Sequence, residues 1–151
     1  MNYIKEYINQ IDEGKIVVGE KVKKIYKRLL KESDDKSLPF YFDEEIGNRP
    51  IEFIETFCKQ AEGEIGKPIK LELFQKAYIQ ALFGFIYRDT GLRRFNETMF
   101  LVGRKNGKTT MLSAIALYMM IADGEGSAEC YSVATKKDQA SKAFKSACAM
   151  R

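Results

Sequence analysis

Apolar residues in the first third of the chain recur at the three- and four-residue spacing of amphipathic helices. The first set predicts a helix that ends at Gly14, and its members are Ile4, Tyr7, Ile8 and Ile11. The second set shares its segment with many lysines, and its members are Val22, Ile25, Tyr26, Leu29 and Leu30. The lysine-rich face of this second helix could contact DNA phosphate, but we favour a solvated helix face.

The middle of the chain predicts two more helices. Turn-forming residues at 33–39 end the second helix, and Asp43 is expected to cap a third, whose early part Pro50 could interrupt. A loop marked by glycine and proline follows at 63–68. The segment Leu73–Tyr87 then predicts an amphipathic helix, with its inward face formed by Phe74, Ala77, Tyr78, Ala81 and Phe85.

Beyond these helices the pattern changes to alternating strands and helices. Residues 98–102 form a short apolar run, which is typical of a buried parallel strand. We expect a loop, then a helix over 108–122 that ends at Gly124. A second strand is expected over 129–134, with Cys130 buried in it.

The last helix is expected to open at a capping box formed by Thr135 and Asp138. The succession of strand, loop, helix, strand and helix is the start of a parallel sheet. The sequence therefore predicts an α/β fold, in which a helical N-terminal region precedes the first strands and helices of a three-layer αβα domain.

Composition is that of a globular chain with the length of one ordinary domain. It has 151 residues, of which 45% are hydrophobic and 30% charged, and a net charge of +4 that permits but does not require a polyanionic partner. No apolar run reaches the roughly 18–20 residues of a membrane span. The start, MNYIKEYINQ, lacks the apolar core of an export signal, so we expect a cytoplasmic protein.

Cysteine and histidine usage limits the possible chemistry. The chain has three widely spaced cysteines, Cys58, Cys130 and Cys148, and no histidine. This pattern indicates free thiols in a reducing compartment, rather than a disulfide framework or a zinc site.

One segment, residues 102–110 with the sequence VGRKNGKTT, carries candidate chemistry. Gly107, Lys108 and Thr109 match the second half of the phosphate-binding P-loop pattern, G-x-x-x-x-G-K-[ST]. Val102 stands where the first glycine of that pattern is expected, and Gly103 follows one position later. The expected strand before the loop and helix after it support a P-loop despite this departure.

Backbone N–H groups at a helix start lack helical partners, and together with the helix dipole they favour phosphate. Gly107 allows close approach of the backbone, Lys108 supplies charge to the β- and γ-phosphates, and Thr109 offers a hydroxyl to Mg²⁺. The other residues expected to contact nucleotide in this loop are Gly103, Arg104, Lys105, Asn106 and Thr110.

The run from Arg104 to Thr109 closely resembles the Walker A segment of large terminase subunits, the DNA-packaging motors of tailed bacteriophages and their prophage relatives. That family often lacks the usual first glycine and has an arginine within the loop. Similar segments cover nearly the whole chain, and they are Phe40–Glu45, Ile51–Glu55, Gly66–Ile69, Leu71–Gln75, Thr90–Phe95 and Ala134–Ala140.

The resemblance implies roles for individual residues. Gln75 would bind the adenine edge through its amide, while Phe74 could stack on the base or, as we favour, pack into the core. Arg104 would act with Lys108 in catalysis, by stabilising charge on the γ-phosphate.

Four further residues have both a functional and a structural interpretation. Gln139 and Thr135 lie where related motors couple nucleotide state to DNA, but helix capping alone explains Thr135. The arginine pair at 93–94 could meet phosphate or a neighbouring subunit, with ordinary surface pairing as an equal alternative.

The resemblance also implies the wider organisation. Residues 1–66 would form the helical region and 67–151 the start of the P-loop ATPase domain. The implied cofactors are ATP and Mg²⁺. The implied partners are double-stranded DNA, the small terminase subunit and the portal protein, around a homo-oligomeric ring in the bacterial host cytoplasm.

Hydrolysis by a P-loop motor needs a second acidic site, in which an apolar strand ends in aspartate. None of the acidic residues after the loop ends such a strand. Since the family's acidic motif and nuclease domain come later, we expect an N-terminal terminase fragment that is marginally stable, binds ATP weakly and does not hydrolyse it. Alternatives are a helicase-like nucleic-acid-stimulated ATPase fragment, or a non-catalytic module that docks terminase subunits or the portal.

Overall fold

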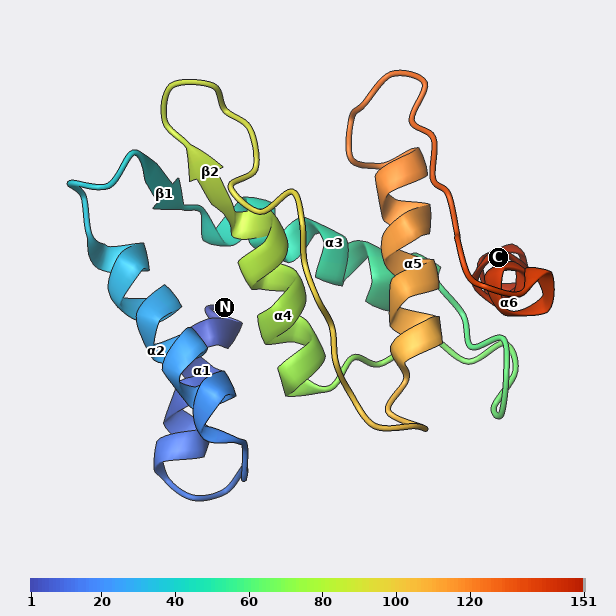
Figure 1. The fold of residues 1–151 in the computed structure, drawn as a ribbon, viewed down its shortest axis with the longest axis horizontal. Helices are drawn as coiled ribbons and strands as arrows, with labels where there is room; N and C mark the ends of the chain where they lie inside the picture. The colour runs from blue at the N-terminus through green and yellow to red at the C-terminus, as the bar shows by residue number, and fades with distance from the viewer. Residues whose placement is uncertain (151) are drawn as a thin grey trace. The chain divides into compact units, whose positions relative to one another are not determined.

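The computed structural model describes residues 1–150, which fold mainly into helices with one small sheet (Figure 1). In chain order the elements are α1 (Tyr3–Asp12), α2 (Glu20–Asp34), β1 (Phe40–Phe42), α3 (Glu44–Phe57), α4 (Leu73–Gly84), β2 (Phe85–Tyr87), α5 (Lys108–Ile121) and α6 (Lys137–Ala149). Two compact units are present. Unit 1 holds Met1–Ile51 and Glu72–Met99, and unit 2 holds Glu52–Leu71 and the chain from Phe100 onward. The sequence division into 1–66 and 67–151 stays a prediction.

Helix α1 in unit 1 forms as its apolar pattern predicts. Its four expected core residues are all buried, and they are Ile4, Tyr7, Ile8 and Ile11. The Asn2 side chain caps the helix by accepting a hydrogen bond from the Lys5 backbone N–H at 2.9 Å. Beyond the helix end, Gly14 has a φ of 74°, a left-handed conformation that suits glycine.

Helix α2 packs on α1 through aromatic and aliphatic contacts. The rings of Tyr26 and Tyr7 meet edge to face, with centroids 4.9 Å apart. Of the apolar set predicted for α2, Leu29 is buried, but Val22 and Ile25 are 37% and 53% exposed. Unit 1 therefore covers only part of the apolar face that the sequence predicts.

Two basic residues of α2 form ion pairs within unit 1. Lys23 Nζ and Lys27 Nζ lie 2.9 and 3.0 Å from Asp12 Oδ1, at the C-terminal end of α1. Their hydrogen bonds and charges lower the pKa of the Asp12 carboxyl below its ordinary value. An acidic side chain is unfavourable at a helix C-terminus, and these two cations offset that repulsion.

The antiparallel pair β1–β2 shortens the helix predicted over Leu73–Tyr87. Helix α4 ends at Gly84, and the next three residues pair in the register Phe40↔Tyr87, Tyr41↔Ile86 and Phe42↔Phe85. Glycine disfavours continued helix, while the aromatic and β-branched residues after it favour a strand. Gly84 is also sterically required, because a Cβ there would lie 2.7 Å from Cε2 of the Phe42 ring.

The inward face of α4 is only partly the predicted one. Ala77 and Ala81 are buried as expected, but Ile79 and Phe83 are buried as well. Apolar residues occupy most sides of this helix, so their spacing does not single out one face.

Helix α3 confirms its predicted cap. Asp43 Oδ1 accepts a hydrogen bond from the Ile46 backbone N–H at 2.9 Å. The helix continues through Pro50, so the expected interruption does not occur. Pro50 is fully buried, and we attribute the tolerance of its missing N–H to this packing.

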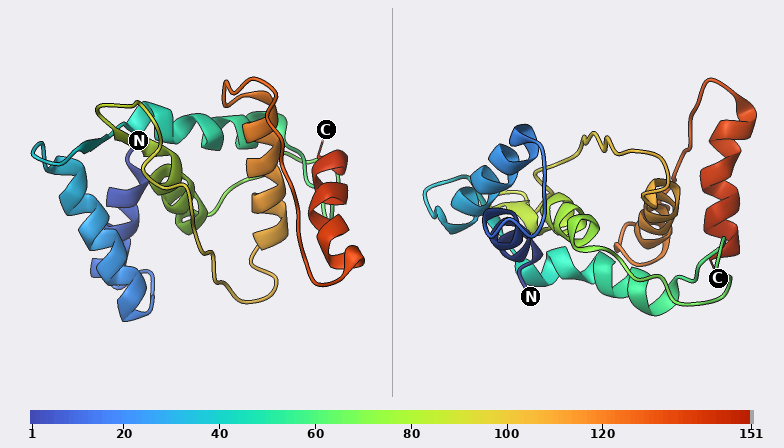
Figure 2. Two further views of the ribbon diagram at one scale, coloured as in Figure 1. Left: turned by 45° about the horizontal axis from the view of Figure 1, so that its top comes forward. Right: turned by 90° about the horizontal axis from the view of Figure 1, so that it is seen from below.

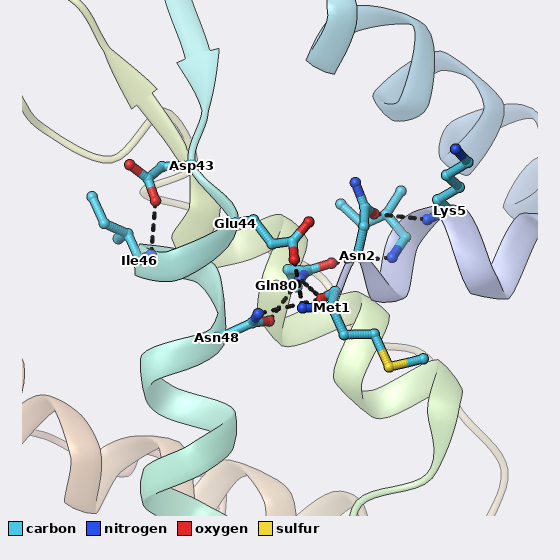
Figure 3. Close-up of polar contacts among 9 residues, drawn as sticks. Met1, Asn2, Lys5, Asp43, Glu44, Ile46, Asn48 and Gln80 are labelled. Atoms are coloured by element: carbon cyan, nitrogen blue, oxygen red, sulfur yellow. Dashed lines mark hydrogen bonds and ion pairs between the residues drawn. The ribbon is translucent and has the colours of Figure 1, made fainter.

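A buried polar cluster joins the start of the chain to α3 and α4 (Figure 3). Gln80 of α4 is fully buried, and its Oε1 accepts a hydrogen bond from the Ile4 backbone N–H at 3.1 Å. Its Nε2 donates to Met1 O at 2.9 Å and to Asn48 Oδ1 at 2.7 Å. Both ends of the Gln80 amide therefore hold α1 and α3 against α4.

In unit 2, α5 and α6 pack side by side (Figure 2). The buried residues of α5 are Met111, Ser113, Ala114, Ile115 and Tyr118. The Ser113 hydroxyl donates to Ala143 O of α6 at 2.9 Å, and the Tyr118 ring meets Phe53 of α3 edge-on at 5.6 Å. Helix α5 thus matches its prediction closely, and it positions the loop before it. No helix within residues 1–150 combines the length and apolar character of a bilayer span.

The parallel sheet expected from residues 98–102 and 129–134 is not formed in the part of the chain that the structure describes. Neither segment is a strand, and β1–β2 is antiparallel. Their apolar side chains are mostly exposed, by 86%, 90%, 81% and 90% at Met99, Leu101, Tyr131 and Val133. A parallel strand needs hydrogen-bonded neighbours and apolar cover on both faces, and these segments have neither among residues 1–150. The fold class is corrected to mainly helical with a small antiparallel sheet.

Two local predictions near the C-terminus are also corrected. Helix α6 begins at Lys137 after the N-cap Lys136, which makes no capping hydrogen bond, so Thr135 does not form the expected capping box. Cys130, expected to be buried, is exposed, with its thiol 3.7 Å from Ala116 O. By contrast Cys58 is buried, and burial raises the pKa of its thiol.

Candidate functional site

The predicted P-loop lies at the start of α5 in unit 2 (Figure 1). Gly107 is the N-cap residue, with a left-handed φ of 67° and ψ of 14°. The first helical bond runs from the Met111 N–H to Gly107 O at 2.9 Å. Because the N–H groups before Met111 have no helical acceptor, the loop presents backbone donors at the positive end of a helix dipole.

The side chains expected to meet nucleotide are accessible. Lys108 and Thr109, in the first turn of α5, are exposed, and Thr110 is half-buried. Arg104 and Lys105, in the turn before the helix, are exposed as well. Three cationic groups are thus exposed around a helix N-terminus, which is an arrangement suited to a phosphate chain.

Asn106 is exposed, and its side chain makes hydrogen bonds within the loop. Its Nδ2 donates to Gly103 O at 3.2 Å and to Arg104 O at 3.3 Å. Between these residues, Lys105 has a φ of 65°, a conformation uncommon for a residue with a side chain. The loop therefore contains a left-handed turn closed by the Asn106 side chain.

Gln75, the predicted adenine contact, lies in unit 1, in the first turn of α4. Its side chain is 6% exposed, and its Oε1 accepts a hydrogen bond from the Glu72 backbone N–H at 3.0 Å. Gln75 therefore helps to cap α4. The sequence contained this signal, because the spacing Glu72-x-x-Gln75 is that of a capping box with glutamate as the first residue. Phe74, beside it, is half-buried.

The arginine pair at 93–94 has structural partners in unit 1. Arg94 Nη1 lies 2.6 Å from Glu32 Oε2, and its guanidinium lies 3.8 Å from the centroid of the Phe40 ring. Arg93 lies over the Phe83 ring at 5.0 Å. These contacts favour the structural interpretation of Arg94, because both members of its ion pair are largely buried.

Residues after the second expected strand are exposed. Thr135 lies before α6 and Gln139 in its first turn, and both side chains are accessible.

No group of three or more acidic, cysteine or histidine side chains within residues 1–150 could hold a metal ion. Thr109 stays the predicted Mg²⁺ contact.

A comparison against protein families matches the second half of the chain. Residues 73–150, just over half of the chain, match the family described as the ATPase domain of the terminase large subunit. The chain belongs to this family. The matched segment contains both α4, with Gln75, and the loop that opens α5.

A comparison with characterised proteins points the same way. The terminase large subunit of Enterobacteria phage HK97 is 33% identical over 100 residues, which cover 65% of this chain and 19% of that protein. The chain therefore aligns with about a fifth of the length of this relative. No solved structure matches the chain significantly.

Proposed function

We propose that the loop Gly103–Thr110 binds the phosphates of ATP, and that the chain serves the ATPase of a phage DNA-packaging motor. The observation that carries this proposal is the position of the loop. It opens α5 through the left-handed Gly107, and it lies inside the segment that matches the terminase ATPase domain. The family match favours this function over the helicase-like alternative.

Each loop residue has a distinct role in the proposal. The Lys108 ammonium neutralises the β- and γ-phosphates, and the Thr109 hydroxyl binds the accompanying Mg²⁺. The exposed Arg104 stabilises charge on the γ-phosphate. Lys105 and Thr110 add charge and a hydroxyl around the same phosphates.

Adenine recognition by Gln75 is part of the same proposal. Its Oε1 already accepts the Glu72 N–H, so adenine binding through this oxygen would replace the capping bond. In this proposal the Gln75 amide caps α4 when the site is empty and binds the base when ATP is present. Phe74 packs beside Gln75.

The wider activity follows from the family and extends beyond this stretch of chain. We propose that the motor acts on double-stranded DNA, together with a small terminase subunit and a portal protein, as a homo-oligomeric ring in the host cytoplasm. The support is the similarity to the terminase large subunit of phage HK97.

Titration of the 151-residue chain with ATP and Mg²⁺ tests the phosphate site. Lys108→Ala should weaken binding about ten- to hundredfold, because hydrogen bonds to charged groups contribute about 1.5–3 kcal/mol. The matched control is Lys142→Ala, which removes another exposed lysine from unit 2 and should leave the affinity unchanged. No binding by the wild-type chain, or equal binding by the Lys108→Ala variant, would refute the proposal.

The metal role of Thr109 is tested separately. Wild-type affinity for ATP should be higher with Mg²⁺ than with a chelator present. In the Thr109→Ala variant this difference should shrink, whereas the affinity for ATP without metal should stay close to that of wild type. An unchanged effect of Mg²⁺ in the variant would remove Thr109 from the metal site.

A further inference from the structure

The side chain of Asn106 is directed toward its own loop. Two of its hydrogen bonds run to Gly103 O and Arg104 O, which are carbonyl oxygens, so the NH₂ end of the amide faces them. The same contacts keep these two carbonyl oxygens turned toward Asn106. Carbonyl oxygens directed at a phosphate would repel it, and in this loop they are occupied by a donor from within the chain.

Glycine at position 103 suits this arrangement. A Cβ at this position would lie 3.3 Å from Asn106 Nδ2, closer than most real Cβ contacts. The close contact favours a small residue one position later than the general P-loop pattern expects its first glycine. At this position, glycine makes room for the Asn106 amide.

The turn that Asn106 closes contains an unfavourable backbone conformation. Lys105 has a φ of 65°, and it lies between Asn106 and the two carbonyl groups that Asn106 binds. Left-handed conformations are disfavoured for residues with a Cβ, so a loop without these hydrogen bonds should leave this conformation. Gly107, next along the chain, is also left-handed, and it opens α5.

From this geometry we propose that Asn106 is a positioning residue, which braces the loop in its phosphate-binding shape and does not itself bind phosphate. The proposal rests on the proposed function of the loop and assigns one residue of it a different role. Asn106 holds Lys105 in the left-handed turn, so that the N–H groups at the start of α5 are arranged before nucleotide arrives. Such pre-organisation strengthens binding, because the loop does not have to be ordered at that moment.

A double-mutant experiment on the full 151-residue chain distinguishes a brace from a ligand. Asn106→Ala should weaken Mg²⁺–ATP binding roughly tenfold. Lys105→Gly and Lys105→Ala are then compared in both backgrounds. The two variants lose the same charge, but only glycine adopts the left-handed conformation without strain.

With Asn106 present, the two position-105 variants should bind ATP with similar affinity, because the loop is already held. With Ala at 106, the Lys105→Gly variant should bind about five-fold or more tightly than the Lys105→Ala variant, since the left-handed conformation must then form on binding. The brace is overturned if the ratio of the two affinities is the same in both backgrounds, as expected for a direct phosphate ligand.

A readout without nucleotide keeps this test separate from the test of the proposed function. In ¹⁵N NMR of the free chain, Asn106→Ala should increase the fast motion of backbone amides at 103–107, and leave the α5 amides after Met111 unchanged. Unaltered loop motion would overturn the brace even if ATP binds. Increased loop motion in a chain that does not bind ATP would support the brace and refute the phosphate site.

Discussion

Replacing the fully buried Gln80 with leucine, a side chain of similar size, should destabilise unit 1 by about 2–3 kcal/mol. The Gln80 amide makes three hydrogen bonds, to the Ile4 N–H, Met1 O and Asn48 Oδ1. Leucine has a similar volume but can make none of these three hydrogen bonds. The expected loss therefore comes from unpaired polar groups rather than from a cavity.

The magnitude follows from what each partner can do after the substitution. Ile4 is in the first turn of α1, where its N–H has no helical acceptor, and its residue is 1% exposed. A buried donor left unpaired costs about 1–3 kcal/mol. Met1 O retains a hydrogen bond from Asn48 Nδ2 at 3.3 Å, and Asn48 is only half-buried, so these two groups add about 1 kcal/mol or less.

Hydrogen exchange is the suitable assay, because two compact units need not unfold together and a single melting curve would mix them. A loss of about 2.8 kcal/mol corresponds to roughly hundredfold faster exchange of the α1 amides. Gln139→Leu, at an exposed position of α6, is the matched control and should leave α1 exchange unchanged. Exchange of α1 within threefold of wild type in the Gln80→Leu variant would refute the argument.

Three further substitutions or reagents test the fold and its titrating groups. Gly84→Ala should destabilise unit 1 by about 1–3 kcal/mol because its Cβ would overlap an aromatic ring, and it should speed exchange of the α4 amides, whereas Gly126→Ala, with open space around it, should leave amide exchange unchanged. A thiol reagent at neutral pH should modify the two exposed cysteines quickly and Cys58 only on unfolding, because burial shields that thiol and raises its pKa. The Asp12 pKa is lowered in the folded chain, so its pairing stabilises the fold above the carboxyl's unfolded pKa and is lost as pH falls through the folded one. Asp12→Asn should therefore speed exchange of the α1 amides at pH 7, and the difference from wild type should shrink as pH falls below the unfolded pKa.

The elements that the sequence predicted well have local causes. Helix α1 follows from apolar spacing that matches one helical face, and the start of α3 follows from a single capping side chain, that of Asp43. Helix α5 follows from an apolar segment that lies between Gly107 and Gly124. In each case, the deciding residues lie within one or two turns of one another.

The strand predictions that failed depend on residues distant in sequence. Residues 85–87 form a strand because they pair with β1, more than forty positions earlier in the chain. The segments 98–102 and 129–134 have strand-like composition, but a strand forms only beside a partner. Strand propensity identifies such segments, but it does not predict which strand, if any, pairs with them.

The candidate site shows the same division. The place of the loop before α5 could be predicted from Gly107 and the helix that follows it. The direction of the Asn106 amide could not, because a motif gives residue types at each position but not the conformation of the turn between them. That conformation depends on Lys105 in the left-handed region, which no propensity of lysine suggests.

Two arginines illustrate how geometry separates a structural role from a proposed catalytic one. Arg94 is held by Glu32 and by the Phe40 ring, and moving it toward a phosphate would break its 2.6 Å ion pair with a largely buried carboxylate and leave Arg28 as the remaining partner of Glu32. Arg104 has the opposite arrangement. Its backbone carbonyl is fixed by Asn106, while its side chain is exposed and has no ion pair within residues 1–150. A side chain that must respond to the charge of a γ-phosphate needs a fixed backbone and an accessible guanidinium. Of these two arginines only Arg104 provides both.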